Sequence, residues 1–156
     1  MNIIRHWWHA PQSARGSVLA LGNFDGVHLG HQAIFKECVV LAKAAGTEPA
    51  ALTFEPHPRE FFAHSHAPMR LYSFRQKVAA IEAAGIKNLF VVRFDERFAS
   101  LSADQFVSHV LYECLQAKHV VTGYNFHFGK NRQGDTDFLA HKARELNFGF
   151  IAHPEV

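Results

Sequence analysis

His28 and His31 are the two residues of this chain whose type and spacing most directly suggest chemistry on a phosphate. Residues at positions i and i+3 face the same way on a helix, so both imidazoles would reach one ligand. Imidazole N–H groups donate hydrogen bonds to phosphate oxygens, and a bound polyanion favours the protonated ring. The pair therefore indicates phosphoryl or nucleotidyl transfer, in which fixed donors meet the charge that spreads over the phosphorus oxygens.

The histidines end a glycine-rich turn that suits phosphate binding. Residues 22–31 read Gly-Asn-Phe-Asp-Gly-Val-His-Leu-Gly-His, and they follow an apolar segment and precede a helical pattern. Glycines let the backbone approach a phosphate, and a helix N-terminus offers unpaired N–H groups and a positive dipole end. The alternative is an ordinary surface helix, and Asp25 could be either a helix cap or a magnesium ligand. A zinc site is disfavoured because no third ligand at a recognisable spacing is evident.

Short apolar segments alternate with helical patterns along the chain, and this alternation predicts an α/β fold. A parallel sheet of about five strands with helices on both faces follows from it. Ligands bind beyond the carboxyl ends of such strands, so the loops after Leu21, Phe54 and Thr122 are expected to converge on one crevice. We expect strands at 18–21, 50–54, 89–92, 119–122 and 148–152, helices at 28–45, 73–84 and 135–146, and one more helix from the capping box at 102–105.

Two of these loops are rich in aromatic side chains. Residues 54–62 form a predicted loop with two prolines, which stiffen it, and Arg59, which could meet a phosphate. Residues 123–132 alternate aromatic with polar side chains. Stiff aromatic loops suit stacking against a flat ring, and the alternative is that these phenylalanines belong to the core.

Composition bounds the class of protein. With 156 residues, of which 48% are apolar and fifteen are Phe, the chain can form one domain with a sizeable core. Its net charge of +2 and scattered basic residues argue against nucleic-acid binding. No apolar run could span a membrane and no secretion signal is evident, so we expect a cytoplasmic protein with buried, reduced Cys38 and Cys114. Trp7 and Trp8 are predicted to be packing residues.

The sequence resembles a known enzyme family. The stretch His28-Leu29-Gly30-His31 resembles the H-x-G-H motif of the nucleotidyltransferase superfamily. Residues 22–32, 52–62, 94–99 and 123–129 together resemble the N-terminal FMN adenylyltransferase module of the prokaryotic bifunctional riboflavin kinase/FAD synthetase, from about Val18 onward. The resemblance implies a Rossmann-like nucleotidyltransferase fold, with ATP, Mg²⁺ and FMN used to make FAD and pyrophosphate. No activated Ser, Cys or Lys is evident, which fits direct attack by the FMN phosphate.

The resemblance also implies roles for individual residues. His28 and His31 are the implied catalytic residues, and no residue is assigned to a metal. Many relatives carry an acidic residue in place of Asn125 and Arg in place of His127. The implied ATP-binding residues are Gly22, Asn23, Phe24, Asp25, Gly26, His28, Gly30, His31 and Asn125, and the implied flavin-binding residues are Phe54, His57, Pro58, Arg59, Phe62, Tyr124, Asn125 and Phe128.

The sequence departs from this family at its end. No Ser/Thr-Arg motif is found after the last predicted strand within these 156 residues, and they include no riboflavin kinase domain. We therefore expect residues 1–156 to be an adenylyltransferase domain that lacks its C-terminal end, taken from a parent protein that also phosphorylates riboflavin. Two other functions stay open: a different H-x-G-H nucleotidyltransferase, or a nucleotide- or flavin-binding module with little activity.

The resemblance implies that the Ser/Thr-Arg motif supplies a cationic clamp on the triphosphate, so without it we expect weaker ATP binding and weaker stabilisation of the transition state. We expect the 156-residue chain to form little or no FAD by itself and to retain nucleotide binding. Chromatographic measurement of FAD after incubation with ATP, FMN and Mg²⁺ tests this expectation. Robust FAD production by the purified chain would contradict it.

Overall fold

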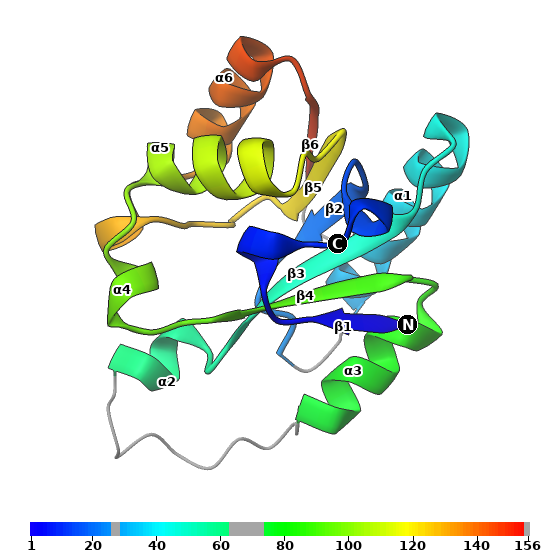
Figure 1. Ribbon diagram of the computed structural model, residues 1–156, viewed down its shortest axis with the longest axis horizontal. Helices are drawn as coiled ribbons and strands as arrows, with labels where there is room; N and C mark the ends of the chain where they lie inside the picture. The colour runs from blue at the N-terminus through cyan, green and yellow to red at the C-terminus, as the bar shows by residue number, and fades with distance from the viewer. Residues whose placement is uncertain (26–28, 63–73, 155–156) are drawn as a thin grey trace.

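A single parallel sheet organises the computed structural model, which describes residues 1–25, 29–62 and 74–154 (Figure 1). The strands lie in the order β1-β4-β3-β2-β5-β6, and every neighbouring pair is parallel. The strands are β1 Asn2–Ile4, β2 Val18–Leu21, β3 Pro49–Glu55, β4 Asn88–Arg93, β5 His119–Gly123 and β6 Gly149–His153.

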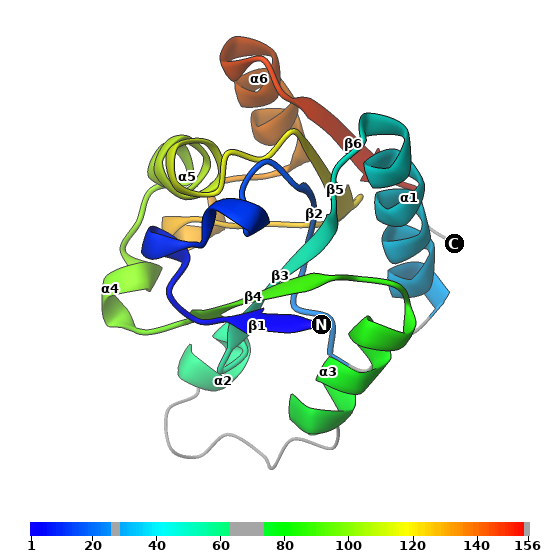
Figure 2. The same cartoon turned by 45° about the vertical axis from the view of Figure 1, so that its right-hand side comes forward.

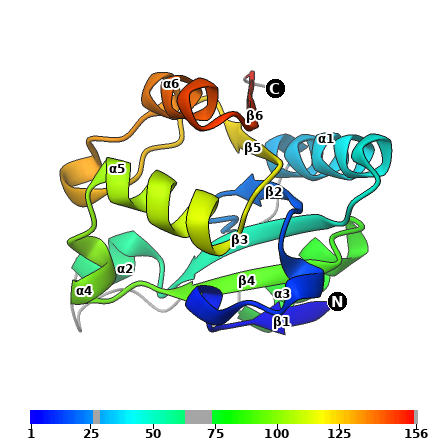
Figure 3. The same cartoon turned by 45° about the horizontal axis from the view of Figure 1, so that its top comes forward.

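Helices cover both faces of the sheet, as Figures 2 and 3 show. On one face α1 and α3 pack against a cluster that includes Val18 and Ala20, and on the other α6 and the helix formed by α5 and η4 cover Leu19 and Leu21. Successive strand residues point to opposite faces, so β2 is buried on both sides. The helices are α1 Leu29–Ala45, α2 Pro58–Phe62, α3 Phe74–Ala83, α4 Glu96–Ala99, α5 Ala103–Gln105, η4 Phe106–Cys114 and α6 Thr136–Leu146, with short 3₁₀ turns η1 Trp7–His9, η2 Gln12–Ala14 and η5 Lys130–Arg132.

The predicted α/β fold with a parallel sheet and helices on both faces is confirmed, and so are two of its predicted helix caps. Ser102 and Gln105 form the expected capping box, and the carboxylate of Asp135 accepts a hydrogen bond from the N–H of Phe138. Residue 73, the first residue of the other predicted capping box, lies outside the described residues.

Four details differ from expectation. The sheet has a sixth strand, β1, because even three residues gain a full set of partners along β4. The segment after β3 was expected to be a loop, and part of it forms the short helix α2. Cys114 is only partly buried, unlike Cys38. Trp7 packs against the core as expected, whereas Trp8 is 57% exposed.

The strand order creates a crevice at the carboxyl edge of the sheet. From β2 the chain continues through β3 and β4 on one side, and later through β5 and β6 on the other. The order reverses between β2 and β5, and such a reversal is where open α/β sheets bind ligands. The loops that follow β2, β3 and β5 leave side by side at this edge (Figure 1).

The loop after β5 is fixed against the start of α5. An antiparallel bridge joins Phe128 to Gly134, and the N–H of Lys130 donates to the carbonyl of Leu101 at 2.7 Å. Gly129 has a φ of +79°, and a Cβ added there would lie 2.7 Å from the backbone of Ala103. The close approach of two backbones therefore requires glycine at this position. Among the described helices, none is long and apolar enough to cross a membrane.

Gly129→Ala should destabilise the protein more than Gly46→Ala does. Gly46 also has a positive φ, of +67°, but a Cβ there would meet nothing within 4 Å. Both variants carry the left-handed backbone cost of about 1–2 kcal/mol. Only Gly129→Ala adds overpacking, which costs about 1–3 kcal/mol more. Urea denaturation of both variants measures the difference, and equal losses would show that Gly129 is not constrained by Ala103.

Candidate functional site

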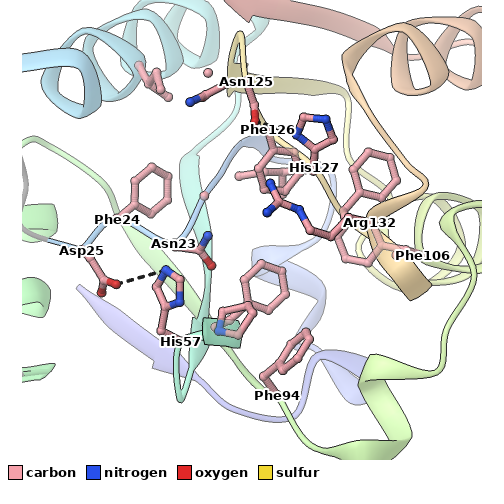
Figure 4. Close-up of a pocket in the computed structure, with 18 of the residues that line it drawn as sticks. Asn23, Phe24, Asp25, His57, Phe94, Phe106, Asn125, Phe126, His127 and Arg132 are labelled. Atoms are coloured by element: carbon pink, nitrogen blue, oxygen red, sulfur yellow. Dashed lines mark hydrogen bonds and ion pairs between the residues drawn. The ribbon is translucent and has the colours of Figure 1, made fainter. Parts of the chain in front are cut away.

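A cavity of about 1070 Å³ opens at the carboxyl edge of the sheet (Figure 4). Its volume is at the upper end for small-molecule sites, so it has room for two ligands side by side. The predicted convergence of three loops is confirmed, since residues that follow β2, β3 and β5 all line it. The segment from β4 to α5 completes the wall with Phe94, Phe98, Ala99 and Leu101.

One half of the cavity is aromatic. Phe54 contacts Phe94 and Phe98 with ring centroids 5.8 and 5.9 Å apart, and Phe106 contacts Phe128 at 5.3 Å. These rings are tilted or edge-to-face, the arrangements that aromatic pairs favour. Phe54 and Phe128 are nevertheless almost fully buried. Membership of the core and a place in a ligand site were alternatives for these phenylalanines, and the structure shows that they are compatible. The same rings pack in the core and line the cavity.

Phe62 differs from the other aromatic residues. It lies on α2, lines the cavity and is 63% exposed. Its ring contacts Phe61 and Phe94 at 5.2 and 5.9 Å. Because Phe62 borders the cavity, a ligand bound there can bury its exposed apolar surface. A single exposed phenylalanine elsewhere on the surface would need no such explanation.

The turn after β2 forms the opposite half. Phe24 is buried between Phe35, 4.7 Å away, and the ring of His31, 5.3 Å away and nearly perpendicular. A Cβ at Gly22 would lie 2.7 Å from the Phe24 ring, so glycine is needed there. Phe24 thus supports the imidazole that lines the cavity. This support was not foreseen from the sequence, where Phe24 was only one residue of a phosphate-binding run.

Asn23 has a role in the structure that the sequence alone did not distinguish from the roles of its neighbours in the turn. Its backbone carbonyl accepts a hydrogen bond from the hydroxyl of Thr53 at 2.9 Å, which ties the turn to β3. Its side-chain Oδ1 is buried and has no hydrogen-bond partner in the described part of the chain. Figure 4 shows the amide in the middle of the cavity, where a bound ligand could satisfy it.

A chain of ionisable side chains connects the turn after β2 with the end of β3. Asp25 Oδ2 lies 3.2 Å from His57 Nε2, and Asp25 Oδ1 lies 3.9 Å from Lys77 Nζ. Lys77, on α3, is 1% exposed and also lies 3.3 Å from Glu55 Oε1. A buried ammonium needs such carboxylate partners, since an uncompensated charge is costly to bury. These pairs therefore hold two walls of the cavity at a fixed separation.

The loop after β5 contributes polar groups beside its buried rings. Asn125 and His127 are exposed to the cavity, and the carbonyl of Asn125 lies 2.9 Å from His127 Nδ1. Arg132, on η5, lines the same wall. Arg132, Phe106 and His153 also line the cavity and were not singled out from the sequence. Arg132 ends the predicted loop 123–132 without a role of its own, His153 follows the last predicted strand, and the helical spacing of Phe106 indicates only a core position.

The candidate residues of the sequence analysis are brought together as a set. All of those with described side chains line this cavity: Gly22, Asn23, Phe24, Asp25, Gly30, His31, Phe54, His57, Pro58, Phe62, Tyr124, Asn125 and Phe128. Gly26 and His28 lie outside the described residues, and so does the side chain of Arg59. The structure thus groups these residues, whereas their individual contacts with a ligand stay predictions.

The described residues do not form a protein cage for a metal ion. Within the described ranges, no group of three His, Cys, Asp or Glu side chains is placed to hold one. Both carboxylate oxygens of Asp25 lie near basic groups, at 3.2 and 3.9 Å. The carboxylate therefore already compensates nearby charge, which favours a structural role over magnesium coordination in this arrangement.

Comparisons with known proteins agree on one family. A family model described as FAD synthetase matches residues 10–156. A bifunctional riboflavin kinase/FMN adenylyltransferase of Pseudomonas fluorescens is 41% identical over 150 residues, which cover 96% of this chain and 47% of that protein. Proteins of the same name from Haemophilus influenzae and Escherichia coli are 38% and 39% identical, covering 97% and 90% of this chain and 48% and 44% of theirs. The chain thus spans about half the length of these relatives.

A solved structure supports the fold. A Streptococcus pneumoniae protein described as a macrolide-efflux protein superposes with a TM-score of 0.83 at 24% identity, over 99% of this chain and 51% of that one. At this identity the likeness shows the shared fold alone.

Lys77→Met should destabilise the protein. It removes the buried partner of Glu55 and Asp25, and breaking a fully buried pair costs about 3–5 kcal/mol. The Asp25 side chain is 40% exposed, so water compensates part of the loss and we expect about 1–3 kcal/mol. Lys36→Met, at an exposed position of α1, is the matched control and should change stability by no more than about 0.5 kcal/mol. Chemical denaturation measures both, and equal stability of the two variants would mean that the ion pairs contribute nothing.

Proposed function

Because the chain belongs to the FAD synthetase family, we propose that it is an FMN adenylyltransferase, which transfers AMP from ATP to FMN and forms FAD and pyrophosphate. One observation carries this proposal: a single cavity joins a glycine-rich strand-to-helix turn to an aromatic wall. The turn suits the phosphates of a nucleoside triphosphate, and the aromatic wall suits a flavin ring. The reaction requires both ligands in one cavity.

The turn after β2 is the proposed site of the ATP phosphates. Gly22 and Gly30 allow close backbone approach, and α1, with 17 residues, presents its N-terminus to the cavity. His31 lines the cavity and is held by Phe24. In the proposal His31, together with His28, donates hydrogen bonds to the phosphate oxygens whose charge increases in the transition state.

The aromatic half is the proposed site of the isoalloxazine ring. Phe54 lies on β3, Phe62 on α2 and Phe128 in the loop after β5, and all three line the same cavity as Pro58. A flat apolar ring placed there replaces water against aromatic surfaces, and it can stack on the exposed face of Phe62. Asn125 and Tyr124 line the same cavity.

The proposed reaction is one direct displacement. An oxygen of the FMN phosphate attacks the α-phosphorus of ATP and forms a new P–O bond, while the bond from the α-phosphorus to the bridging oxygen breaks and pyrophosphate leaves. Mg²⁺ enters bound to the ATP as part of the substrate and neutralises phosphate charge. The chain's own contribution is to orient the two phosphates in line and to supply fixed N–H donors.

The relatives' names suggest a wider role for a longer protein. We propose that a riboflavin kinase domain accompanies this domain in the same polypeptide, as in the bifunctional relatives, and supplies FMN. The free thiols of Cys38 and Cys114 fit a reducing compartment such as the cytoplasm.

FMN binding and turnover test the proposed function. Flavin fluorescence should be quenched when FMN is titrated into the chain, because the ring then lies among aromatic side chains. With ATP and Mg²⁺ added, FAD and pyrophosphate should appear slowly and in equal amounts. His31→Ala should slow their formation by roughly 100- to 1000-fold, as the loss of an oxyanion donor does.

The matched control is His141→Ala, an exposed histidine on α6 that does not line the cavity. It should leave binding and turnover unchanged. Pyrophosphate release with a different phosphate acceptor and none with FMN would contradict the proposal. Binding of FMN and ATP without turnover would favour a binding module instead.

A further inference from the structure

We propose that Arg132 determines the specificity of the acceptor site, by binding the phosphate of FMN and so favouring FMN over riboflavin. This inference rests on the proposed function and goes further, since it assigns a residue and a ligand group that the sequence motifs did not. It follows from three features of Arg132: its place in the cavity, its charge and its backbone.

Arg132 lies on the wall that carries the aromatic rings. It belongs to η5, in the loop whose Phe126 and Phe128 stack with centroids 5.6 Å apart. In Figure 4 its side chain lies among Phe126, His127 and Phe106, across the cavity from Asp25. A flavin whose ring contacts the aromatic wall would extend its phosphate-bearing tail past this guanidinium toward the turn after β2.

Charge singles out this side chain. Arg132 is the one arginine or lysine among the described side chains that line the cavity. The ion pairs found within the described ranges do not involve it. Asp25, the one carboxylate among the described lining residues, is paired with His57 on the opposite wall. The guanidinium therefore keeps its fixed charge and its planar donors for a ligand, and phosphate matches both.

The backbone holds Arg132 in an unusual conformation. Asn131 and Arg132 have φ angles of +57° and +55°, in the left-handed region that residues with a Cβ rarely occupy. The N–H of Arg132 donates to the carbonyl of Gly129 at 2.9 Å, and the bridge between Phe128 and Gly134 closes the loop around it. Consecutive strained residues persist where surrounding contacts over-determine them, and they gather at ligand sites. The guanidinium is thus presented from a fixed turn, which lowers the entropy lost on binding.

The position favours the FMN phosphate over the phosphates of ATP. The proposed triphosphate site has its own donors, the N-terminus of α1 and His31, on the other side of the cavity. Arg132 adjoins the rings instead. Riboflavin offers the same ring without the phosphate, so a cation here would distinguish the two flavins by charge.

Flavin titrations of Arg132→Met test the inference. We expect its affinity for FMN to fall roughly 10- to 100-fold, the range for losing charge-assisted hydrogen bonds, while its affinity for riboflavin is unchanged. Arg132→Lys keeps the charge without the planar fork and should lose less. Lys130→Met is the matched control: Lys130 belongs to the same turn and is exposed, but it does not line the cavity, so both affinities should stay as in the parent chain.

The possible outcomes are distinguishable. Equal losses for FMN and riboflavin would mean that Arg132 acts through packing, and a loss confined to ATP would mean that it serves the nucleotide; either result overturns the inference. Riboflavin binding by Arg132→Met is also the check that the variant is folded. If the parent chain binds neither flavin, the proposed function itself fails, and this differs from flavin binding that does not depend on Arg132.

Discussion

The parallel order of six strands, with β2 between β3 and β5, is the constraint on which the site depends. Parallel neighbours end at the same edge, so three loops far apart in the sequence must leave the sheet together. The hydrogen bond from Thr53 to the carbonyl of Asn23 and the ion pairs of Lys77 then fix the distance between two of them. The third is fixed by the contact of Gly129 with Ala103. These contacts therefore set the shape of the cavity as well as stabilising the fold.

The aromatic residues serve the core and the cavity at the same time. Phe54 and Phe128 belong to the core cluster and also line the cavity, so the wall is as rigid as the protein interior. Phe62 and Tyr124 are the exposed exceptions among the aromatic lining residues, and Arg132 is exposed as well. This division gives the cavity a preformed apolar wall with exposed side chains beside it, an arrangement that favours binding of a large flat ligand with a charged tail.

The order of strands and helices and the position of the cavity could be predicted from the sequence, because both follow from local sequence patterns. Alternating apolar segments and caps such as Ser102 and Asp135 gave the α/β order, and the strand-end rule gave the convergence of the loops. The sequence could not give β1, whose three residues are stabilised only by pairing with β4. It could not single out Arg132 either, because a positive φ and a place on the cavity wall are tertiary properties. The contact between Phe24 and His31 is also a tertiary property, so it could not be predicted from the sequence.

The central claim is that one cavity holds a flavin against a nucleotide. A crystal structure of the chain with FMN and a non-hydrolysable ATP analogue tests it most directly. Our account predicts the isoalloxazine ring against Phe54, Phe62 and Phe128, and the triphosphate at the turn that includes Gly22 and His31. The two ligands should place the FMN phosphate in line with the α-phosphorus. A flavin bound outside this cavity, or phosphates bound away from that turn, would contradict the account.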